Sequence, residues 1–277
     1  MSPLPSRYVL FTDLDGTLLD HQTYSWAGAR EALAELEQRG VPLVFCTSKT
    51  RSEVEMLRRK VRNAHPFITE NGGGVFIPQG YFPRRIPGET RVGRYHCLAL
   101  GRPYEDVVEA MQAIAKQAGA DVVGFHQMTA HEVADNTGLT LAEAELARKR
   151  DFDEPFFFAG GNAKAEATFL QAARQRGLEV TRGGRFWHLF SGSDKGKAVR
   201  RLFDLYRQGA HHKLRSVALG DSANDLPLLA AADQAFLLPR PDGSFDAEVL
   251  EKLPRVARGA APGSQGWNAA VLGLFPS

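Results

Sequence analysis

Short apolar runs alternate with segments of helical spacing at both ends of this chain, and this alternation constrains the fold more than any other feature. Residues 8–12, 41–47 and 66–69 have the composition of buried strands, while residues 26–39 and 50–62 between them have helical periodicity. A strand–helix–strand–helix–strand order is typical of a parallel sheet covered by helices.

The same alternation of strands and helices returns near the C-terminus. Helices are predicted there at residues 195–207 and 225–232, and strands at 216–219, 235–238 and 256–257. Between the two parts the predicted elements are mixed: a hairpin at 75–82, strands at 94–100, 122–125 and 154–159, helices at 103–117, 140–150 and 164–176, and a closing hairpin at 179–190. We therefore predict an α/β fold. A Rossmann-like parallel-sheet core, formed by residues 1–84 and 191–277, is interrupted by an inserted α+β domain at residues 85–190.

Two groups of polar residues directly follow the first two predicted strands, at the edge where open α/β sheets bind ligands. Asp13 and Asp15, next to Gly16, place two carboxylates at one strand end. One carboxylate can act as a covalent nucleophile while the other moves protons; alternatively, the pair is an acidic turn that caps a helix. A hydroxyl of Thr47 or Ser48 after the second strand can donate to a phosphoryl oxygen, although Ser and Thr also cap helices frequently.

Two further groups belong to the second part of the core. Lys195 and Lys197 begin a predicted helix, where either could supply a positive charge beside the helix N–H groups, and either could be an ordinary surface charge. The loop Gly220–Asp225 holds two carboxylates and an amide after a strand. Hard oxygen ligands of this kind suit Mg²⁺, while a simple acidic helix cap is the alternative.

Taken together, Asp-x-Asp-Gly-Thr at 13–17, the hydroxyls at 47–48, Lys195 and Gly-Asp-x-x-Asn-Asp at 220–225 resemble the haloacid dehalogenase (HAD) superfamily. The insertion is similar to the type-2 α/β cap of the sugar-phosphate phosphatases in that superfamily. Asp15 favours phosphatase or phosphomutase chemistry, because the dehalogenases lack this second carboxylate.

The resemblance implies a role for each core residue. Asp13 would attack phosphorus and form a phosphoaspartate, and Asp15 would protonate the leaving alcohol and then activate water. Thr47 and Lys195 would bind the phosphoryl group. A Mg²⁺ ion would bind Asp13, the backbone carbonyl of Asp15 and Asp221, and the metal loop would be ordered by Ser222, Asn224 and Asp225.

Several stretches further resemble the mannosyl-3-phosphoglycerate phosphatase family: residues 47–50, 70–74, 129–134, 137–139, 150–156 and 184–189. The implied reaction releases phosphate and mannosylglycerate, a compatible solute. Arg150, His131, Arg182 and Arg185 are candidates for the glycerate carboxylate, and Glu70, Asn71, Gln127, Thr129 and Glu154 for sugar hydroxyls. Ser48, Lys49, Gly72 and Gly73 complete the predicted substrate-binding set. The run Gly72–Gly74 is either an anion-binding nest or a hinge.

The composition limits the possible partners. The 34 Lys and Arg nearly balance the 32 Asp and Glu, for a formal net charge of +2, so neither nucleic acid nor an anionic membrane is expected as a partner. Cys46 and Cys97 are too few for a disulfide framework, and the first residues lack a signal-peptide pattern. We expect a cytoplasmic monomer or homodimer.

Other functions remain open at this point. They are a phosphoaspartate signalling receiver, a catalytically silent binding protein, a broader sugar-phosphate phosphatase of the glucosyl-3-phosphoglycerate or sucrose-phosphate type, and a phosphomannomutase-like phosphotransferase.

Overall fold

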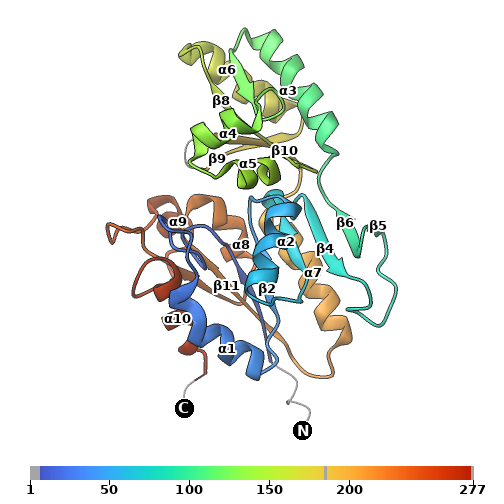
Figure 1. Ribbon diagram of the computed structural model, residues 1–277, viewed down its shortest axis with the longest axis vertical. Coiled ribbons are helices and arrows are strands. Elements are labelled where there is room, and N and C mark those ends of the chain that lie inside the picture. The colour runs from blue at the N-terminus through green and yellow to red at the C-terminus, as the bar shows by residue number, and fades with distance from the viewer. Residues whose placement is uncertain (1–6, 184–185, 276–277) are drawn as a thin grey trace.

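The large sheet of the protein holds nine strands in the order β13-β12-β11-β1-β2-β3-β4-β6-β5 (Figure 1). The computed structural model describes residues 7–183 and 186–275. The strands of this sheet are β1 (Tyr8–Thr12), β2 (Leu43–Cys46), β3 (Phe67–Thr69), β4 (Gly74–Pro78), β5 (Thr90–Val92), β6 (Tyr95–Ala99), β11 (Arg215–Gly220), β12 (Gln234–Leu237) and β13 (Ala257–Arg258).

The first six strands in this order are parallel, as the alternating pattern predicts, and the last three are joined antiparallel. Strand β1 lies between β11 and β2, with Phe11 paired to Ala218 on one side and Val44 on the other. All three of these side chains are fully buried. A strand covered on both faces must be apolar throughout, which explains the unbroken apolar run before Asp13.

Helices cover both faces of this sheet. One face packs against α1 (Arg30–Gln38), α2 (Arg51–Lys60) and α10 (Gly263–Leu272), and the other against α7 (Lys195–Gly209), α8 (Leu226–Ala230) and α9 (Ala247–Lys252). Short 3₁₀ turns, η1 (Ala27–Ala29), η2 (Glu70–Gly72) and η3 (Ala223–Asp225), precede α1, β4 and α8. We call this part of the protein the core.

A second, four-stranded sheet has the order β7-β8-β10-β9 and lies at the top of Figure 1. Its elements are β7 (Val122–Gly124), β8 (Glu154–Phe158), β9 (Leu178–Gly183) and β10 (Phe186–Ser191), with helices α3 (Tyr104–Ala118), α4 (Ala130–Thr137), α5 (Leu141–Ala147) and α6 (Ala163–Gln175). Helices α3 and α6 share one apolar cluster with the sheet, and α4 and α5 share another. We call residues 104–191 the cap.

The structure corrects two details of the predicted insertion. Strands β5 and β6, which lie inside the expected range 85–190, pair with the large sheet, so the second sheet and its helices occupy residues 104–191. Residues 81–82 do not form the second arm of a hairpin. Both edges of β4 are already taken, by β3 and by β6, and no edge is left for a tight hairpin partner.

Three helices were missed by the sequence analysis: α4, α9 and α10. Helix α4 is only eight residues long, although Thr129 and Glu132 form a capping box at its start. Helix α10 contains Gly263 and Gly266, which have low helix propensity, and it is held by tertiary packing around the fully buried Trp267.

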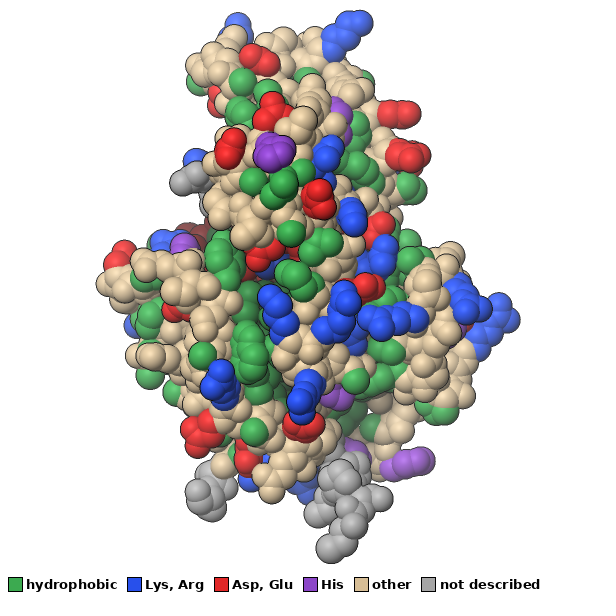
Figure 2. Space-filling model, in the orientation of Figure 1, with side chains coloured by type: hydrophobic (Ala, Val, Ile, Leu, Met, Phe, Trp, Pro, Cys, Tyr) green, Lys and Arg blue, Asp and Glu red, His purple; other side chains and the backbone are tan. Residues whose placement is uncertain are grey.

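The surface shows where the nearly balanced charges lie. In Figure 2, Lys and Arg side chains gather across the middle of one face, over α2, while acidic side chains are scattered. Among the residues that the structure describes, no helix is both long and apolar enough to cross a membrane.

Candidate active site

A cavity of about 740 Å³ opens at the carboxyl ends of β1 and β11 and extends to the cap. This volume lies within the range of roughly 300–1,000 Å³ that is common for small-molecule sites. The core contributes Asp13, Asp15, Gly16, His21, Tyr24, Ser48, Asp221, Ser222, Ala223, Asn224, Arg240 and Asp246, and the cap contributes Asn136, Thr137, Arg182, Phe186 and His188. Residues predicted from the first and fourth motifs therefore line one cavity together.

Lys195 lies at the centre of the charged groups of the core. Its Nζ is 2.7 Å from Oδ1 of Asp13 and 2.7 Å from Oδ1 of Asp225, and its side chain is almost fully buried. Lys197, the alternative lysine, is half exposed and points to Gly192 O and Asp194. The structure thus brings Lys195, and not Lys197, to the predicted nucleophile.

The backbone around Asp13 is held by buried hydrogen bonds. The N–H of Asp13 donates to Leu219 O at 2.9 Å, which extends the parallel ladder by one residue. The Thr12 hydroxyl donates to Asp13 O at 2.8 Å and accepts from Nε1 of Trp267 at 2.9 Å. Because β1 is rigid and fully packed, the Asp13 carboxylate has a defined position at the cavity floor.

Burial and mutual repulsion determine the charge state of the acidic cluster. Burial, followed by the nearby charge of Asp225, raises the pKa of Asp13 to about 7. Burial, then Asp225 and Asp13, raises the pKa of Asp221 to about 8. Burial alone would favour neutral Lys195, but the carboxylates of Asp13 and Asp225 raise its pKa above the usual range. One lysine therefore offsets only part of the negative charge that three carboxylates concentrate here.

The donor set suits a hard divalent cation. Carboxylate oxygens of Asp13, Asp221 and Asp225 lie within 4.8 Å of one another. Asp225 also orders the loop, because its Oδ2 accepts from the N–H groups of Asp221 at 3.0 Å and Ser222 at 3.3 Å. A Cβ on Gly16 would lie 2.6 Å from Oδ2 of Asp221, so only glycine leaves that carboxylate in place. Clustered oxygens with incomplete charge compensation are the ligands that Mg²⁺ prefers.

Asp15 occupies the cavity on the side facing solvent. Its side chain is 39% exposed, and its Oδ2 is 2.9 Å from Nζ of Lys49. Lys49 lies 3.8 Å from Oε1 of Glu53, the residue that completes the capping box of α2 with Thr50. Burial opposes the charge of Lys49, but Asp15 and Glu53 raise its pKa above the usual range. Lys49 therefore holds the Asp15 carboxylate through an ion pair at the cavity wall.

Thr47 lies at the end of β2 with its side chain buried, and its hydroxyl oxygen accepts from the N–H of Lys49 at 3.2 Å. Ser48 lines the cavity, and its carbonyl accepts from Nη2 of Arg150 at 2.9 Å. These two hydroxyl residues lie at the predicted sheet edge.

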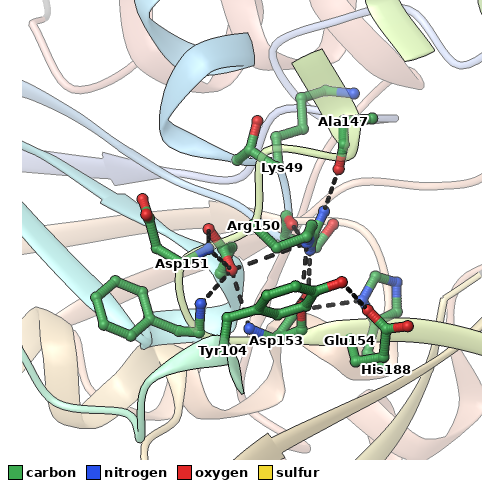
Figure 3. Close-up of polar contacts among 12 residues, drawn as sticks. Lys49, Tyr104, Ala147, Arg150, Asp151, Asp153, Glu154 and His188 are labelled. Atoms are coloured by element: carbon green, nitrogen blue, oxygen red, sulfur yellow. Dashed lines mark hydrogen bonds and ion pairs between the residues drawn. The ribbon is translucent and has the colours of Figure 1, made fainter. Parts of the chain in front are cut away.

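Glu70, a predicted sugar ligand, instead joins the core to the cap. It is fully buried, and its carboxylate accepts hydrogen bonds from the N–H groups of Asp151, Phe152 and Asp153 at 2.7–3.0 Å. Figure 3 shows the labelled cap residues of this junction. Because the carboxylate binds three successive backbone N–H groups, Glu70 anchors the start of β8 to the core.

Arg150, a predicted carboxylate ligand, belongs to the same junction (Figure 3). Its guanidinium is buried and donates to Asp153 and to the carbonyls of Ser48 and Ala147. Asn71 adjoins it, donating from Nδ2 to Asp153 at 2.9 Å and accepting from Nδ2 of Asn224 at 3.1 Å. Arg150 thus connects the cap with Ser48 of the core, and Asn71 connects it with the loop Gly220–Asp225. Neither residue lines the cavity.

At the glycine run Gly72–Gly74, other segments of the chain lie very close to the glycine Cα atoms. A Cβ on Gly72 would lie 2.3 Å from Asp194 O, and a Cβ on Gly73 would lie 2.4 Å from Cβ of Phe152. Both glycines are buried. The N–H of Gly73 donates to Glu70 O at 3.0 Å, so Gly73 does not offer a free N–H group to an anion.

Replacing Gly72 by Ala is expected to lower the free energy of unfolding by about 2–4 kcal/mol, because the new Cβ would meet backbone and φ is +94°. Gly88→Ala is the matched control, since its φ is +80° but no atom lies within 4 Å of the added Cβ. Urea unfolding of both variants measures the difference. Equal destabilisation would contradict the role of close approach.

The remaining cap candidates divide into those that face the cavity and those that do not. Arg182 lines the cavity and lies over the Trp187 ring. Thr129 caps α4, Gln127 accepts from Gly124 N–H, and His131 is exposed away from the cavity lining. Arg185 lies outside the described residues.

Sequence reasoning missed several lining residues, among them His21, Tyr24, His188, Arg240 and Asp246. Arg240 and Asp246 follow β12, so the rule applied to the other strand ends could have found them. They also pair with each other, with Nη2 of Arg240 2.7 Å from Oδ2 of Asp246. His21 and Tyr24 lie in an irregular loop that gave no periodic signal.

The comparisons with known proteins agree with this geometry. A family profile described as haloacid dehalogenase-like hydrolase matches residues 10–82. A glucosyl-3-phosphoglycerate/mannosyl-3-phosphoglycerate phosphatase from Methanococcoides burtonii is 40% identical over 269 residues, which are 97% of this chain and 97% of that protein. The chain belongs to this phosphatase family. The same name is carried by a protein from Persephonella marina that is 38% identical over 95% of both chains. A mannosyl-3-phosphoglycerate phosphatase from Pyrococcus furiosus is 37% identical, over 83% of this chain and 90% of that protein.

Solved structures support the fold. A HAD subclass IIB sugar phosphatase matches 97% of this chain and 99% of its own with a TM-score of 0.65 at 18% identity. A haloacid dehalogenase-like hydrolase from Bacteroides thetaiotaomicron matches 98% of this chain and all of its own length (100%), with a TM-score of 0.66 at 15% identity. The resemblance to the HAD superfamily drawn from the motifs is therefore confirmed.

Proposed function

We propose that this protein hydrolyses mannosyl-3-phosphoglycerate and its glucosyl analogue, releasing phosphate and the corresponding glycosylglycerate. The observation that carries this proposal is the buried contact of Lys195 with Asp13, which lines, together with Asp221, a cavity shared with the cap. The substrates are inferred from the names of the relatives. The two relatives that match almost the whole chain are named for both the glucosyl and the mannosyl substrate.

In this reaction, a carboxylate oxygen of Asp13 attacks phosphorus, and the bond between phosphorus and the glycerate oxygen breaks on the opposite side. Lys195 holds the attacking carboxylate and offsets the charge on the phosphoryl oxygens, which is the main requirement of phosphoryl transfer. Thr47, at the end of the neighbouring strand β2, donates its hydroxyl to the same group. The product of this step is a phosphoaspartate at Asp13.

Asp15 moves the protons. Its position beside the cavity and its 39% exposure allow it to reach both the leaving oxygen and solvent. It gives a proton to the departing alkoxide and then takes one from the water that hydrolyses the phosphoaspartate. Lys49 keeps the carboxylate in place between these two steps.

We propose that Mg²⁺ is the resident cofactor, held by Asp13, Asp221 and the backbone carbonyl of Asp15. When bound, the ion would reduce repulsion between the phosphate and the nucleophile. Asp225, Ser222 and Asn224 would keep the loop in the arrangement described above.

A phosphate-release screen tests the substrate assignment. It compares mannosyl-3-phosphoglycerate, its glucosyl analogue, mannose and glucose phosphates and sucrose phosphate at equal concentrations. We expect kcat/KM for the two phosphoglycerates to exceed the others by at least about 100-fold. Equal rates across the panel would favour a broader sugar-phosphate phosphatase, and retention of phosphate on the sugar would indicate a mutase.

Removal of divalent metal is expected to abolish activity and to make stability depend on pH. The pKa values of Asp13 and Asp221 rise on folding from 3.8 to about 7 and about 8, so stability from these groups is present below about pH 4 and is lost as pH rises through 7–8. The Tm of the EDTA-treated protein should therefore be lower at pH 8 than at pH 5.5, and Mg²⁺ should raise the Tm most at pH 8.

Asp221→Asn is the control, since it removes one of the two groups and should flatten the pH dependence of Tm. Full phosphatase activity after exhaustive metal removal, or an unchanged pH dependence in this variant, would contradict the metal assignment.

We further propose that the enzyme works in the cytoplasm as a monomer or homodimer, with a phosphorylated sugar–glycerate as its partner and a compatible solute as its product. The free thiols of Cys46 and Cys97 are compatible with a reducing compartment.

A further inference from the structure

His188 lies on the cap strand β10, and the alternation of that strand turns it toward the cavity. Trp187 and Leu189 pack with the cluster formed by α3 and α6. Their neighbours Phe186 and His188 lie on the opposite face of the sheet and line the cavity. The imidazole is therefore one of the cap groups that a ligand bound at Asp13 can meet.

The orientation of the ring is determined by Asp153. Nδ1 of His188 is 3.1 Å from Oδ2 of Asp153, a contact visible in Figure 3. Asp153 is fully buried, so burial opposes its charge, but Arg150 and His188 lower its pKa. An ionised carboxylate only accepts hydrogen bonds, so Nδ1 carries the proton and Nε2 is left for a ligand.

The Asp153 carboxylate also connects His188, through hydrogen bonds, to the loop Gly220–Asp225. Asp153 accepts from Nδ2 of Asn71 at 2.9 Å, and Asn71 accepts from Asn224 at 3.1 Å. This chain of hydrogen bonds runs from the cap strand to the loop that holds Asp221. The imidazole is thus linked by hydrogen bonds to the core as well as to the cap.

We propose that His188 is a specificity-determining residue whose Nε2 accepts a hydrogen bond from a hydroxyl of the substrate's sugar, with Asp153 as its positioning residue. This inference rests on the proposed function, since it requires a sugar-bearing phosphate ester. An acceptor nitrogen suits a sugar hydroxyl and not the glycerate carboxylate, which cannot donate.

Steady-state kinetics of four proteins test the inference: the wild type, His188→Ala, His188→Gln and the control His131→Ala. His131 is an exposed histidine of the cap and is not part of the cavity lining. Each protein is assayed with mannosyl-3-phosphoglycerate and with p-nitrophenyl phosphate, which lacks the sugar and the glycerate.

We expect His188→Ala to lower kcat/KM for mannosyl-3-phosphoglycerate by about 10- to 100-fold, mainly through KM, and to change kcat/KM for p-nitrophenyl phosphate less than about twofold. His188→Gln should lose less than His188→Ala, because its carboxamide can still accept a hydrogen bond. His131→Ala should match the wild type with both substrates.

The outcomes separate the two proposals. A wild type without preference for mannosyl-3-phosphoglycerate overturns the proposed function and this inference with it. A wild type with that preference, but equal losses for both substrates in His188→Ala, overturns the role of His188 alone. The role of His188 is also overturned if His188→Ala keeps the full preference for mannosyl-3-phosphoglycerate. It is overturned as well if His131→Ala loses as much kcat/KM for that substrate as His188→Ala.

Discussion

Asp13→Asn is expected to lower kcat for phosphate release by at least about 10³-fold while the fold stays intact. A carboxamide cannot form the phosphoaspartate, and the remaining groups can only bind the substrate. Because burial raises the pKa of Asp13 to about 7, its charge is unfavourable in the metal-free fold, and its removal should not lower Tm. Phosphate release and thermal unfolding measure the two effects.

The control for this variant is Asp204→Asn on α7, where the side chain is 55% exposed and pairs only weakly with Arg207. It should retain wild-type turnover. Near-normal phosphate release by Asp13→Asn would contradict the nucleophile assignment, and a collapse of its Tm would show that the fold depends on the ion pair between Asp13 and Lys195.

Lys195→Met should reduce both activity and stability. Methionine has a similar length but leaves the buried carboxylates of Asp13 and Asp225 without the cation that lies 2.7 Å from each. Breaking a buried ion pair by removing one partner costs about 3–5 kcal/mol. The loss of charge at the phosphoryl group should lower kcat by about 10²–10³-fold. Urea unfolding and phosphate release at saturating Mg²⁺ provide the two measurements.

Lys197→Met is the matched control, two residues along the same helix, with a half-exposed side chain. It should change the free energy of unfolding by no more than about 0.5 kcal/mol and leave kcat unchanged. Similar losses in the two variants would mean that the lysines act through the general charge of the helix start, contrary to the geometry.

The structure also changes where substrate recognition is expected. Arg150 and Glu70 have the residue types of ligand-binding groups, yet their polar atoms are occupied by the junction between core and cap. Arg182 and His188 of the cap and Arg240 of the core line the cavity instead. We therefore expect substrate recognition to combine groups from the cap and from the core.

Much of the core could be predicted because the sequence patterns of its strands and motifs involve residues that are close together in the chain. Most of the parallel strands are buried on both faces and have the pattern of an apolar run, and three of the four motifs directly follow such a run. The helix predicted at 140–150 begins with a local signal of this kind, because Thr140 and Glu143 form a capping box at the start of α5. By contrast, β5 has little apolar character of its own. Strand β6 was predicted as a strand, but its membership of the large sheet depends on its pairing with β4.

The sequence by itself determined the parallel α/β core and the order of the four motifs, because strand burial and motif spacing are properties of neighbouring residues. The phosphoryl chemistry was what the resemblance of these motifs to the HAD superfamily implied. Only the tertiary structure decided between Lys195 and Lys197, placed Glu70 and Arg150 in the junction, and brought His188 to the cavity. The physical reason is that these assignments depend on which polar atoms are already paired. A buried carboxylate or guanidinium takes its partners from distant segments, and only the folded chain determines which of them remain free for a substrate.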